Sequence, residues 1–143
     1  GTPAAGPTAA TNYAEAWKTF TADYKKQDGA FPSPSLFAHA YYINMKAAIL
    51  ALEKVGGDLS DDGAKFREAL AGLEFETPTG KVSLDDNRNA VADMYLTEVS
   101  EADDGTLVNK MIQVTPQVNQ TLGIKADEFM ALGAVSRENP SCP

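Results

Sequence analysis

Few side chains in this sequence could carry out covalent chemistry, and they stand far apart. The chain has one histidine, His39, and one cysteine, Cys142. Nucleophilic catalysis needs a nucleophile beside a base, and no nucleophile stands at a recognisable spacing from His39. One histidine and one cysteine also cannot supply a four-ligand zinc site. The sequence therefore predicts a protein that is not an enzyme, with His39 solvated on the polar side of a helix.

The best candidate for a metal site is the polar run 85–89, Asp-Asp-Asn-Arg-Asn. Its oxygen ligands alternate as they do in a calcium loop. Such a loop also needs glycine at its sixth position and glutamate at its twelfth, and this chain has Ala90 and Leu96 there. The only Gly-Gly pair, at 56–57, follows a helix, whereas a phosphate loop precedes one. We therefore predict a polar turn at 85–89, and neither a metal nor another cofactor.

Three neighbouring side chains could instead recognise a small molecule. Asn44 falls on the apolar side of a predicted helix, and a buried amide needs hydrogen-bond partners. It either binds a neighbouring backbone group or faces a polar ligand. Tyr41 and Tyr42 each offer a flat apolar face and a hydroxyl, which suit a pocket that encloses an organic molecule. Packing in the protein core is the alternative for both tyrosines.

Composition bounds the class of protein. The chain has 143 residues, of which 43% are hydrophobic and 22% charged, as in ordinary globular domains. The formal net charge of −8 would repel a phosphate backbone, so nucleic acid is excluded as a partner. No apolar run approaches the roughly 20 residues of a membrane span. The single Cys142 is either a free thiol on a frayed tail or a link to a cysteine outside this chain in an oxidising compartment.

Three helices are predicted in the first half of the chain. Residues 1–11 are rich in glycine, proline, alanine and threonine and are expected to be coil. Asn12 can cap a helix over 12–27, whose aromatic residues recur at helical spacing and suit core packing. A long helix follows over 35–55, and Ser60 is expected to cap a third helix that ends at Ala71.

The long helix is unusually apolar. Its only polar stripe contains His39, Lys46 and Glu53, which are spaced by seven, while most other positions are aliphatic, aromatic or alanine. A helix of this kind is expected to be covered on most sides, and therefore to pack inside a larger body.

The second half of the chain is predicted to consist mainly of antiparallel hairpins. Alternating patterns indicate strands over 73–76 and 81–84, joined by a Thr-Pro-Thr-Gly turn. Two longer strands over 92–99 and 106–114 are joined by an Asp-Gly turn. A short helix is predicted over 126–132. Because the helices and hairpins segregate along the chain, it is expected to have an α+β layout when taken alone.

Two stretches carry a family resemblance. Phe37–Asn44, continuing to Ala51–Gly57, gives a tyrosine-led helix that ends in Ala-Leu-Glu-x-x-Gly. Glu76–Asp85, followed by Asn87, Asn89 and Tyr95–Leu96, gives a threonine–glycine turn, a short strand and a second hairpin strand. In this order the two stretches resemble the leucine/isoleucine/valine-type periplasmic solute-binding proteins. The resemblance covers roughly residues 10 to 115, departs after Val114, and involves chains more than twice this length.

The resemblance implies an α/β fold in which this chain is the C-terminal part of a two-lobed type I periplasmic binding protein. Residues 1–11 would then be coil from a longer chain, and 12–84 would complete the N-terminal lobe. Residues 85–93 would cross the hinge, and 94–143 would add a hairpin and a tail to the C-terminal lobe.

The resemblance also implies a function. The protein would be the extracytoplasmic component of an ABC importer, located in the periplasm after export by a signal peptide. It would capture an amino acid, an aromatic acid or an amide in the cleft between its lobes. Its partners would be that ligand, the permease in the inner membrane and the remaining N-terminal part of the same protein. Tyr42 matches the position that lends an aromatic wall to the pocket, followed by Tyr41, with Asn44 and His39 as further ligand-binding candidates.

Two other functions stay open. The same fold also serves as the ligand-sensing domain of receptors and regulators, which a DNA-binding or membrane-spanning segment elsewhere in the protein would favour. An independent extracellular domain that acts through a protein–protein surface would require the long helix to be covered by its own chain.

Overall fold

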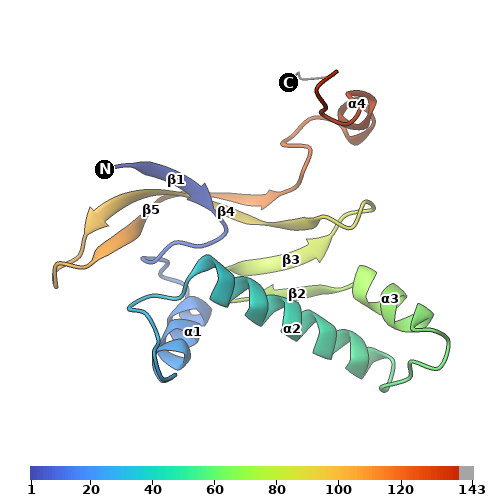
Figure 1. Cartoon of the computed structure of the whole chain (residues 1–143), viewed down its shortest axis with the longest axis horizontal. Helices are drawn as coiled ribbons and strands as arrows, with labels where there is room; N and C mark the ends of the chain where they lie inside the picture. Colours follow the sequence, from blue (N-terminus) through green and yellow to red (C-terminus); the bar gives the residue numbers. More distant parts are fainter. Residues whose placement is uncertain (139–143) are drawn as a thin grey trace.

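A computed structural model gives the fold and describes residues 1–138, so that Cys142 lies outside the described residues. Within this range the structure has five strands and four helices (Figure 1). None of these helices is long and apolar enough to cross a membrane. The elements, in chain order, are β1 (Pro3–Gly6), α1 (Glu15–Lys25), α2 (Leu36–Lys54), α3 (Ala64–Ala71), β2 (Glu74–Thr77), β3 (Gly80–Leu84), β4 (Ala90–Glu101), β5 (Leu107–Val118) and α4 (Ala126–Ala131).

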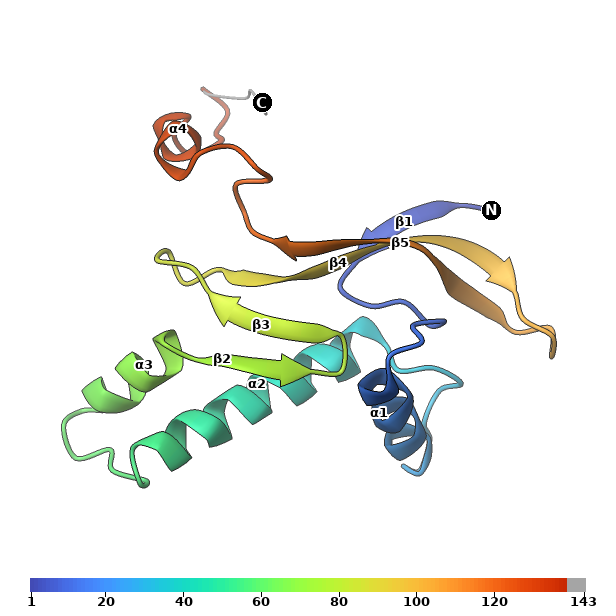
Figure 2. The ribbon, with the colours of Figure 1, turned by 180° about the vertical axis from the view of Figure 1, so that it is seen from behind.

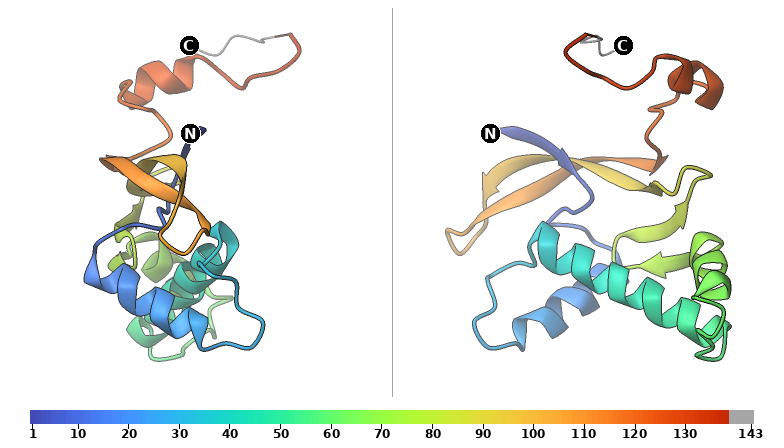
Figure 3. Two further views of the ribbon diagram at one scale, coloured as in Figure 1. Left: turned by 90° about the vertical axis from the view of Figure 1, so that its left-hand side faces the viewer. Right: turned by 45° about the vertical axis from the view of Figure 1, so that its right-hand side comes forward.

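The elements form two bodies joined along β4. Helices α1, α2 and α3 pack with the β2–β3 hairpin, and α2 lies across one face of that hairpin (Figures 1 and 2). Strands β4 and β5 form a long antiparallel ribbon beside this body, with β1 paired to β4. Helix α4 stands apart at the end of an extended segment (Figure 3). The predicted mixture of helices and antiparallel hairpins is confirmed.

Helix α2 agrees with its prediction, and its first turn shows why. The hydroxyl of Ser35 accepts a hydrogen bond of 3.1 Å from the backbone N–H of Ala38, one of the donors that a helix N-terminus leaves without a partner. Helix α1 begins three residues later than predicted. Asn12 does not cap it, because its carbonyl binds the N–H of Ala14 and its amide donates to Tyr95 on β4.

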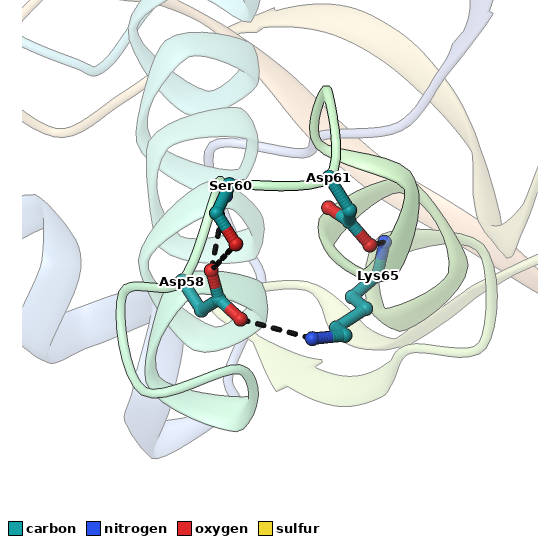
Figure 4. A network of polar contacts seen from close by, with 4 residues as sticks. All are labelled: Asp58, Ser60, Asp61 and Lys65. Atoms are coloured by element: carbon teal, nitrogen blue, oxygen red, sulfur yellow. Dashed lines mark hydrogen bonds and ion pairs between the residues drawn. The ribbon is translucent and has the colours of Figure 1, made fainter.

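The start of α3 differs from the prediction because its N-cap residue is Gly63 and not Ser60. The Asp61 carboxylate accepts the backbone N–H of Lys65 at 3.0 Å (Figure 4). The hydroxyl and N–H of Ser60 both donate to Asp58, whose other oxygen is 2.9 Å from the Lys65 ammonium. The hydrogen bonds from Ser60, followed by that from Lys65, lower the pKa of Asp58 to about 2. This loop places Gly63 in the left-handed region, so that the helix cannot begin before Ala64.

The interpretation of residues 1–11 as coil is wrong for Pro3–Gly6. This segment pairs antiparallel with β4, with Pro3 opposite Glu98 and Gly6 opposite Tyr95. Its composition has low strand propensity, so backbone pairing with a strand some ninety positions away decides its structure.

The strands confirm the predicted hairpins, and two of them are longer than predicted. β4 and β5 extend over twelve residues each. The turn between them places Gly105 at φ +80°, a conformation that favours glycine, and closes with a hydrogen bond from Ala102 N–H to Thr106 O. The turn at 85–89 is also confirmed, since Asp85 Oδ1 accepts the N–H groups of Asn87 and Asn89.

The buried core of the described residues is small, and its hydrophobic members are distributed over α1, α2, α3, β4 and the segment before α1. Trp17 is 2% exposed, Ala51 is fully buried and Tyr95 is 4% exposed. Of the predicted aromatic stripe on α1, Trp17 packs against Phe20 with ring centroids 5.7 Å apart, whereas Tyr13 is largely exposed.

The opposite side of α2 is apolar and uncovered by residues 1–138. We call it the outer face of α2, formed by Phe37, Tyr41, Met45 and Ile49 at four-residue spacing. These side chains are 71%, 75%, 63% and 48% exposed. The expectation that α2 is covered on most sides is therefore not met within the described chain.

Two alanines on α2, one fully buried and one beside a hollow, allow the packing of this helix to be tested. Ala51 is fully buried, so Ala51→Leu should lower the free energy of unfolding by about 1–3 kcal/mol through overpacking. Ala47→Leu is the matched control, because Ala47 lines a hollow of about 320 Å³ with room for a larger side chain. Chemical denaturation measures both. Equal destabilisation by the two variants would contradict this packing.

Candidate functional site

A groove of about 560 Å³ lies between α1, α2 and the turn that joins β2 to β3. Helix α1 supplies one wall, the middle of α2 supplies the opposite wall, and the turn closes one end. Of the four predicted ligand-binding residues, Tyr42 lines this groove. The lining residues are Ala16, Thr19, Phe20, Asp23, Tyr24, Gln27, Ala38, Tyr42, Lys46, Glu76, Thr77 and Pro78.

Aromatic rings form the apolar part of the groove. The rings of Phe20 and Tyr42 lie 5.0 Å apart between centroids and are inclined by 53°, which joins the two helices. Tyr42 remains 44% exposed, and Tyr24 lines the same wall one turn further along α1. A planar apolar molecule could pack against these rings.

The polar part of the groove contains one ammonium and two carboxylates. Lys46 Nζ donates to the backbone oxygen of Glu76 at 2.7 Å and lies 5.8 Å from the centroid of the Phe75 ring. This holds the end of the lysine side chain beside the groove, leaving ammonium protons for another acceptor. Asp23 is already paired with Lys26 at 2.7 Å. A ligand carboxylate could therefore bind Lys46.

His39 lies behind the aromatic wall. It is 2% exposed, and its ring centroid is 6.1 Å from that of Trp17 and 6.2 Å from that of Phe20. The expectation that His39 is solvated is wrong, because this side of α2 packs against α1 and the β2–β3 turn. Burial lowers the pKa of His39 below its ordinary value, which favours the neutral ring.

The neutral ring of His39 takes part in a buried hydrogen bond with Thr79. The two side chains are 3.0 Å apart between Nε2 and Oγ1. Thr77 donates its hydroxyl proton to the backbone oxygen of Gly80 at 2.6 Å and accepts the backbone N–H of Thr79 at 3.2 Å. The tautomer of the His39 ring sets which of the two side chains donates in the bond between His39 and Thr79.

The same turn is bound to β4 and to the segment before α1. The Tyr95 hydroxyl donates to the backbone oxygen of Thr79 at 2.8 Å and accepts from the Asn12 amide at 3.1 Å. Burial, reinforced by the nearby charge of Asp93, raises the pKa of Tyr95. The phenol therefore stays protonated and able to donate. Residues from four separate parts of the chain are thus fixed around Thr79.

Tyr41 and Asn44 lie elsewhere. Tyr41 belongs to the outer face of α2. Asn44 is exposed and not buried as expected, and it lies at the rim of an apolar hollow of about 320 Å³ between α2, α3 and the β2–β3 hairpin. The structure therefore brings Tyr42 and His39 to the same aromatic cluster and leaves the other two predicted residues outside it.

Sequence reasoning did not assign Phe20 and Lys46 to the site. Phe20 was recognisable as part of the aromatic stripe, but a helical stripe alone does not distinguish core packing from a groove. Lys46 lies on the polar stripe of α2, and no pattern in the neighbouring sequence indicates that β2 lies beside it. Among residues 1–138, no three histidine, cysteine, aspartate or glutamate side chains gather where they could hold a metal ion.

Comparison with known proteins gives the family. The profile of the family described as periplasmic binding protein matches residues 1–106. The chain belongs to this family. The predicted resemblance and fold class are therefore confirmed, and members of the family bind solutes and are not enzymes. Membership also implies an extracytoplasmic location.

Individual relatives agree with this assignment. The chain is 42% identical over 73 residues to the Leu/Ile/Val-binding protein homolog 6 of Brucella abortus, which covers 50% of this chain and 18% of that protein.

Two solved structures are similar to most of the chain. A solute-binding protein of an ABC transporter from Rhodopseudomonas palustris BisB5, in complex with 3,4-dihydroxy benzoic acid, has a TM-score of 0.73 and 29% identity. The match covers 83% of this chain and 32% of the R. palustris protein. An ABC transporter substrate-binding protein from Sphaerobacter thermophilus has a TM-score of 0.70 and 26% identity. The match covers 80% of this chain and 31% of that protein. The chain thus spans about a third of these structures.

The buried neutral His39 predicts how stability depends on pH. Its pKa in the folded chain lies below the ordinary value of 6.5. As the pH falls below 6.5, the unfolded chain binds a proton at this residue before the folded chain does, so the free energy of unfolding decreases until the pH passes the folded pKa. We expect the melting temperature to fall below about pH 6.5, and to fall less in His39→Gln. If the melting temperatures of the unsubstituted protein and of His39→Gln fell equally with pH across this range, His39 would not be a buried neutral ring.

Proposed function

We propose that the chain is part of an extracytoplasmic solute-binding protein that captures a small organic molecule for an ABC importer. Family membership supports this role. The observation in the chain itself that supports it most directly is the groove in which Phe20 and Tyr42 stand beside the ammonium of Lys46.

A small aromatic acid fits this groove better than the other candidate ligands. Its ring would pack on Phe20 and Tyr42, and its carboxylate would accept a charge-assisted hydrogen bond from Lys46. The similar protein from R. palustris was solved with an aromatic acid bound. An amino acid is the second candidate, because Glu76 at the rim could bind its ammonium, and the curated relative is named for branched amino acids.

The groove would be half of the binding site. We propose that α1–α3 and the β2–β3 hairpin belong to one lobe, that 85–93 cross the hinge, and that the β4–β5 ribbon belongs to the other lobe. A ligand that binds the closed arrangement more tightly would draw the lobes together. The closed form would then dock on the permease of the inner membrane.

The rest of the same protein would cover the outer face of α2. This face is apolar from Phe37 to Ile49 and lacks cover from residues 1–138. Water-exposed apolar patches of this kind are typical of surfaces buried by other polypeptide. The chain spans about a third of its structural relatives, so a large part of such a protein remains to supply the cover.

Substitutions in the groove test the ligand. In the whole protein, Lys46→Met should weaken benzoate binding about 10-fold or more by removing a charged hydrogen bond, and should weaken benzamide binding less, because the neutral amide loses a hydrogen bond but no ion pair. Tyr42→Ala should weaken both. Isothermal titration calorimetry with benzoate, benzamide and leucine measures these effects. Lys54→Met, on an exposed position of the same helix, is the control. Unchanged benzoate affinity in both groove variants would remove the groove from the site.

A charged substitution on the outer face of α2 tests whether the rest of the protein covers this face. Met45→Glu should lower the free energy of unfolding of the whole protein by about 3 kcal/mol or more, because an unpaired carboxylate would be buried. The same substitution should change the stability of the 143-residue chain little, since Met45 is 63% exposed there. Asn44→Glu, on the neighbouring position, is the control. If the whole protein tolerates Met45→Glu as well as the chain alone, its outer face is uncovered.

A further inference from the structure

The two bodies of the chain are joined by the hydrogen bond from Tyr95 to Thr79 O and, further along β4, by a short stretch of strand pairing. β3 pairs with β4 at only two positions, Ser83 opposite Val91 and Leu84 opposite Ala90. From Tyr95 to Glu98, β4 pairs with β1 as well as with β5. Asp93 lies between these two pairings in the sequence of β4. Figure 2 shows that β3 and β4 diverge from each other. The ladder alone therefore fixes the angle between the bodies weakly.

β5 carries an irregularity opposite Asp93. Ala92 pairs with Val118 and Met94 pairs with Thr115, so Pro116 and Gln117 both lie opposite a single residue of β4. This is a β-bulge, and it leaves a backbone donor without a ladder partner. Gln117 adopts φ +49°, a region that costs energy for a residue with a side chain. Its N–H donates instead to Asp93 Oδ1 at 3.0 Å.

The side chain of Gln117 extends this contact to a third strand. Its Nε2 donates to Asp93 Oδ1 and to the backbone oxygen of Lys81, both at 3.1 Å. We call Asp93, Gln117 and the Lys81 carbonyl the Asp93 clip. It joins β3, β4 and β5 at the point where β3 and β4 no longer pair.

The other oxygen of the same carboxylate lies against the β2–β3 turn. A Cβ atom on Gly80 would approach Asp93 Oδ2 to 2.8 Å, and Gly80 adopts φ +112°, so a larger residue there would displace the carboxylate and strain the backbone. This turn carries Thr77 and Pro78, which line the groove, and Thr79, which binds His39. Through β3 and this turn, the clip acts on the position of the groove.

We propose that Asp93 is a positioning residue that, with Gln117, stabilises the angle between the groove and the β4–β5 ribbon seen in this structure, which is one of the arrangements between which the proposed hinge moves. The contacts that carry this inference lie within the chain. Only its consequence for ligand binding rests on the proposed function, in which the ribbon belongs to the second lobe.

Spin-label distances measure the angle directly. In a Cys142→Ser background, labels at Lys54→Cys on α2 and Leu107→Cys on the ribbon should give one narrow distance distribution. Asp93→Ala should broaden or shift it. Asp93→Asn keeps a carbonyl oxygen that can accept both hydrogen bonds from Gln117, and should restore the narrow distribution. Asp86→Ala, which removes the same charge from the nearby exposed turn, should change nothing.

A second variant keeps the proposal testable if Asp93→Ala does not fold. Gln117→Asn tolerates the left-handed backbone, but its shorter side chain cannot reach both Asp93 and Lys81 O. It should broaden the distance distribution while the melting temperature changes little. A distribution as narrow as that of the unsubstituted chain in Gln117→Asn, or in a folded Asp93→Ala, would overturn the proposal. If the whole protein binds neither benzoate nor leucine, the proposed function fails, while these distances still decide the role of Asp93.

Discussion

The buried turn around Thr79 is the contact on which the rest of the structure depends. Its backbone oxygen accepts from Tyr95 on β4, and its hydroxyl binds His39 on α2. Tyr95 in turn accepts from Asn12, which precedes α1. Each of these polar groups is buried, so that the loss of one partner would leave another without a hydrogen bond in a site that excludes water. The turn therefore links the helices to the ribbon through contacts that must all be made together.

This arrangement explains how a small core can present an ordered groove. Trp17 and Phe20 pack against the ring of His39, and Tyr42 packs on Phe20 from the next helix. On one side His39 forms a hydrogen bond with the hydroxyl of Thr79, and on the other side its ring packs against the rings of Trp17 and Phe20. A neutral imidazole suits both tasks, whereas a charged ring would have to be desolvated. The wall of the groove is thus supported from behind by the same residues that attach the turn.

The outer face of α2 and the groove have different physical characters. The first is a continuous apolar stripe without a charge, as expected of a surface that other polypeptide covers. The second combines rings with Lys46 and two carboxylates, as expected of a surface that meets a polar organic molecule. Both lie on one helix, which accounts for the scarcity of polar residues along α2. A sequence that serves two buried surfaces cannot show a simple amphipathic pattern.

Local sequence determined the elements that depend on local physics. The extent of α2 follows from its Ser35 cap and its composition, the β4–β5 hairpin from its Asp-Gly turn, and the family from two ordered stretches of residues. Tyr42 could be singled out in the same way.

Only the tertiary structure decided the placement of residues whose partners are distant in the chain. β1 forms because residues 3–6 meet β4, although their composition indicates coil. His39 is buried because α1 and the β2–β3 turn pack against its side of α2, and Lys46 enters the site because β2 lies beside it. Asp93 accepts a hydrogen bond from Gln117 at a β-bulge that no local sequence pattern predicts. In each case the free energy comes from contacts between segments brought together by folding, which propensity and periodicity along the chain do not encode.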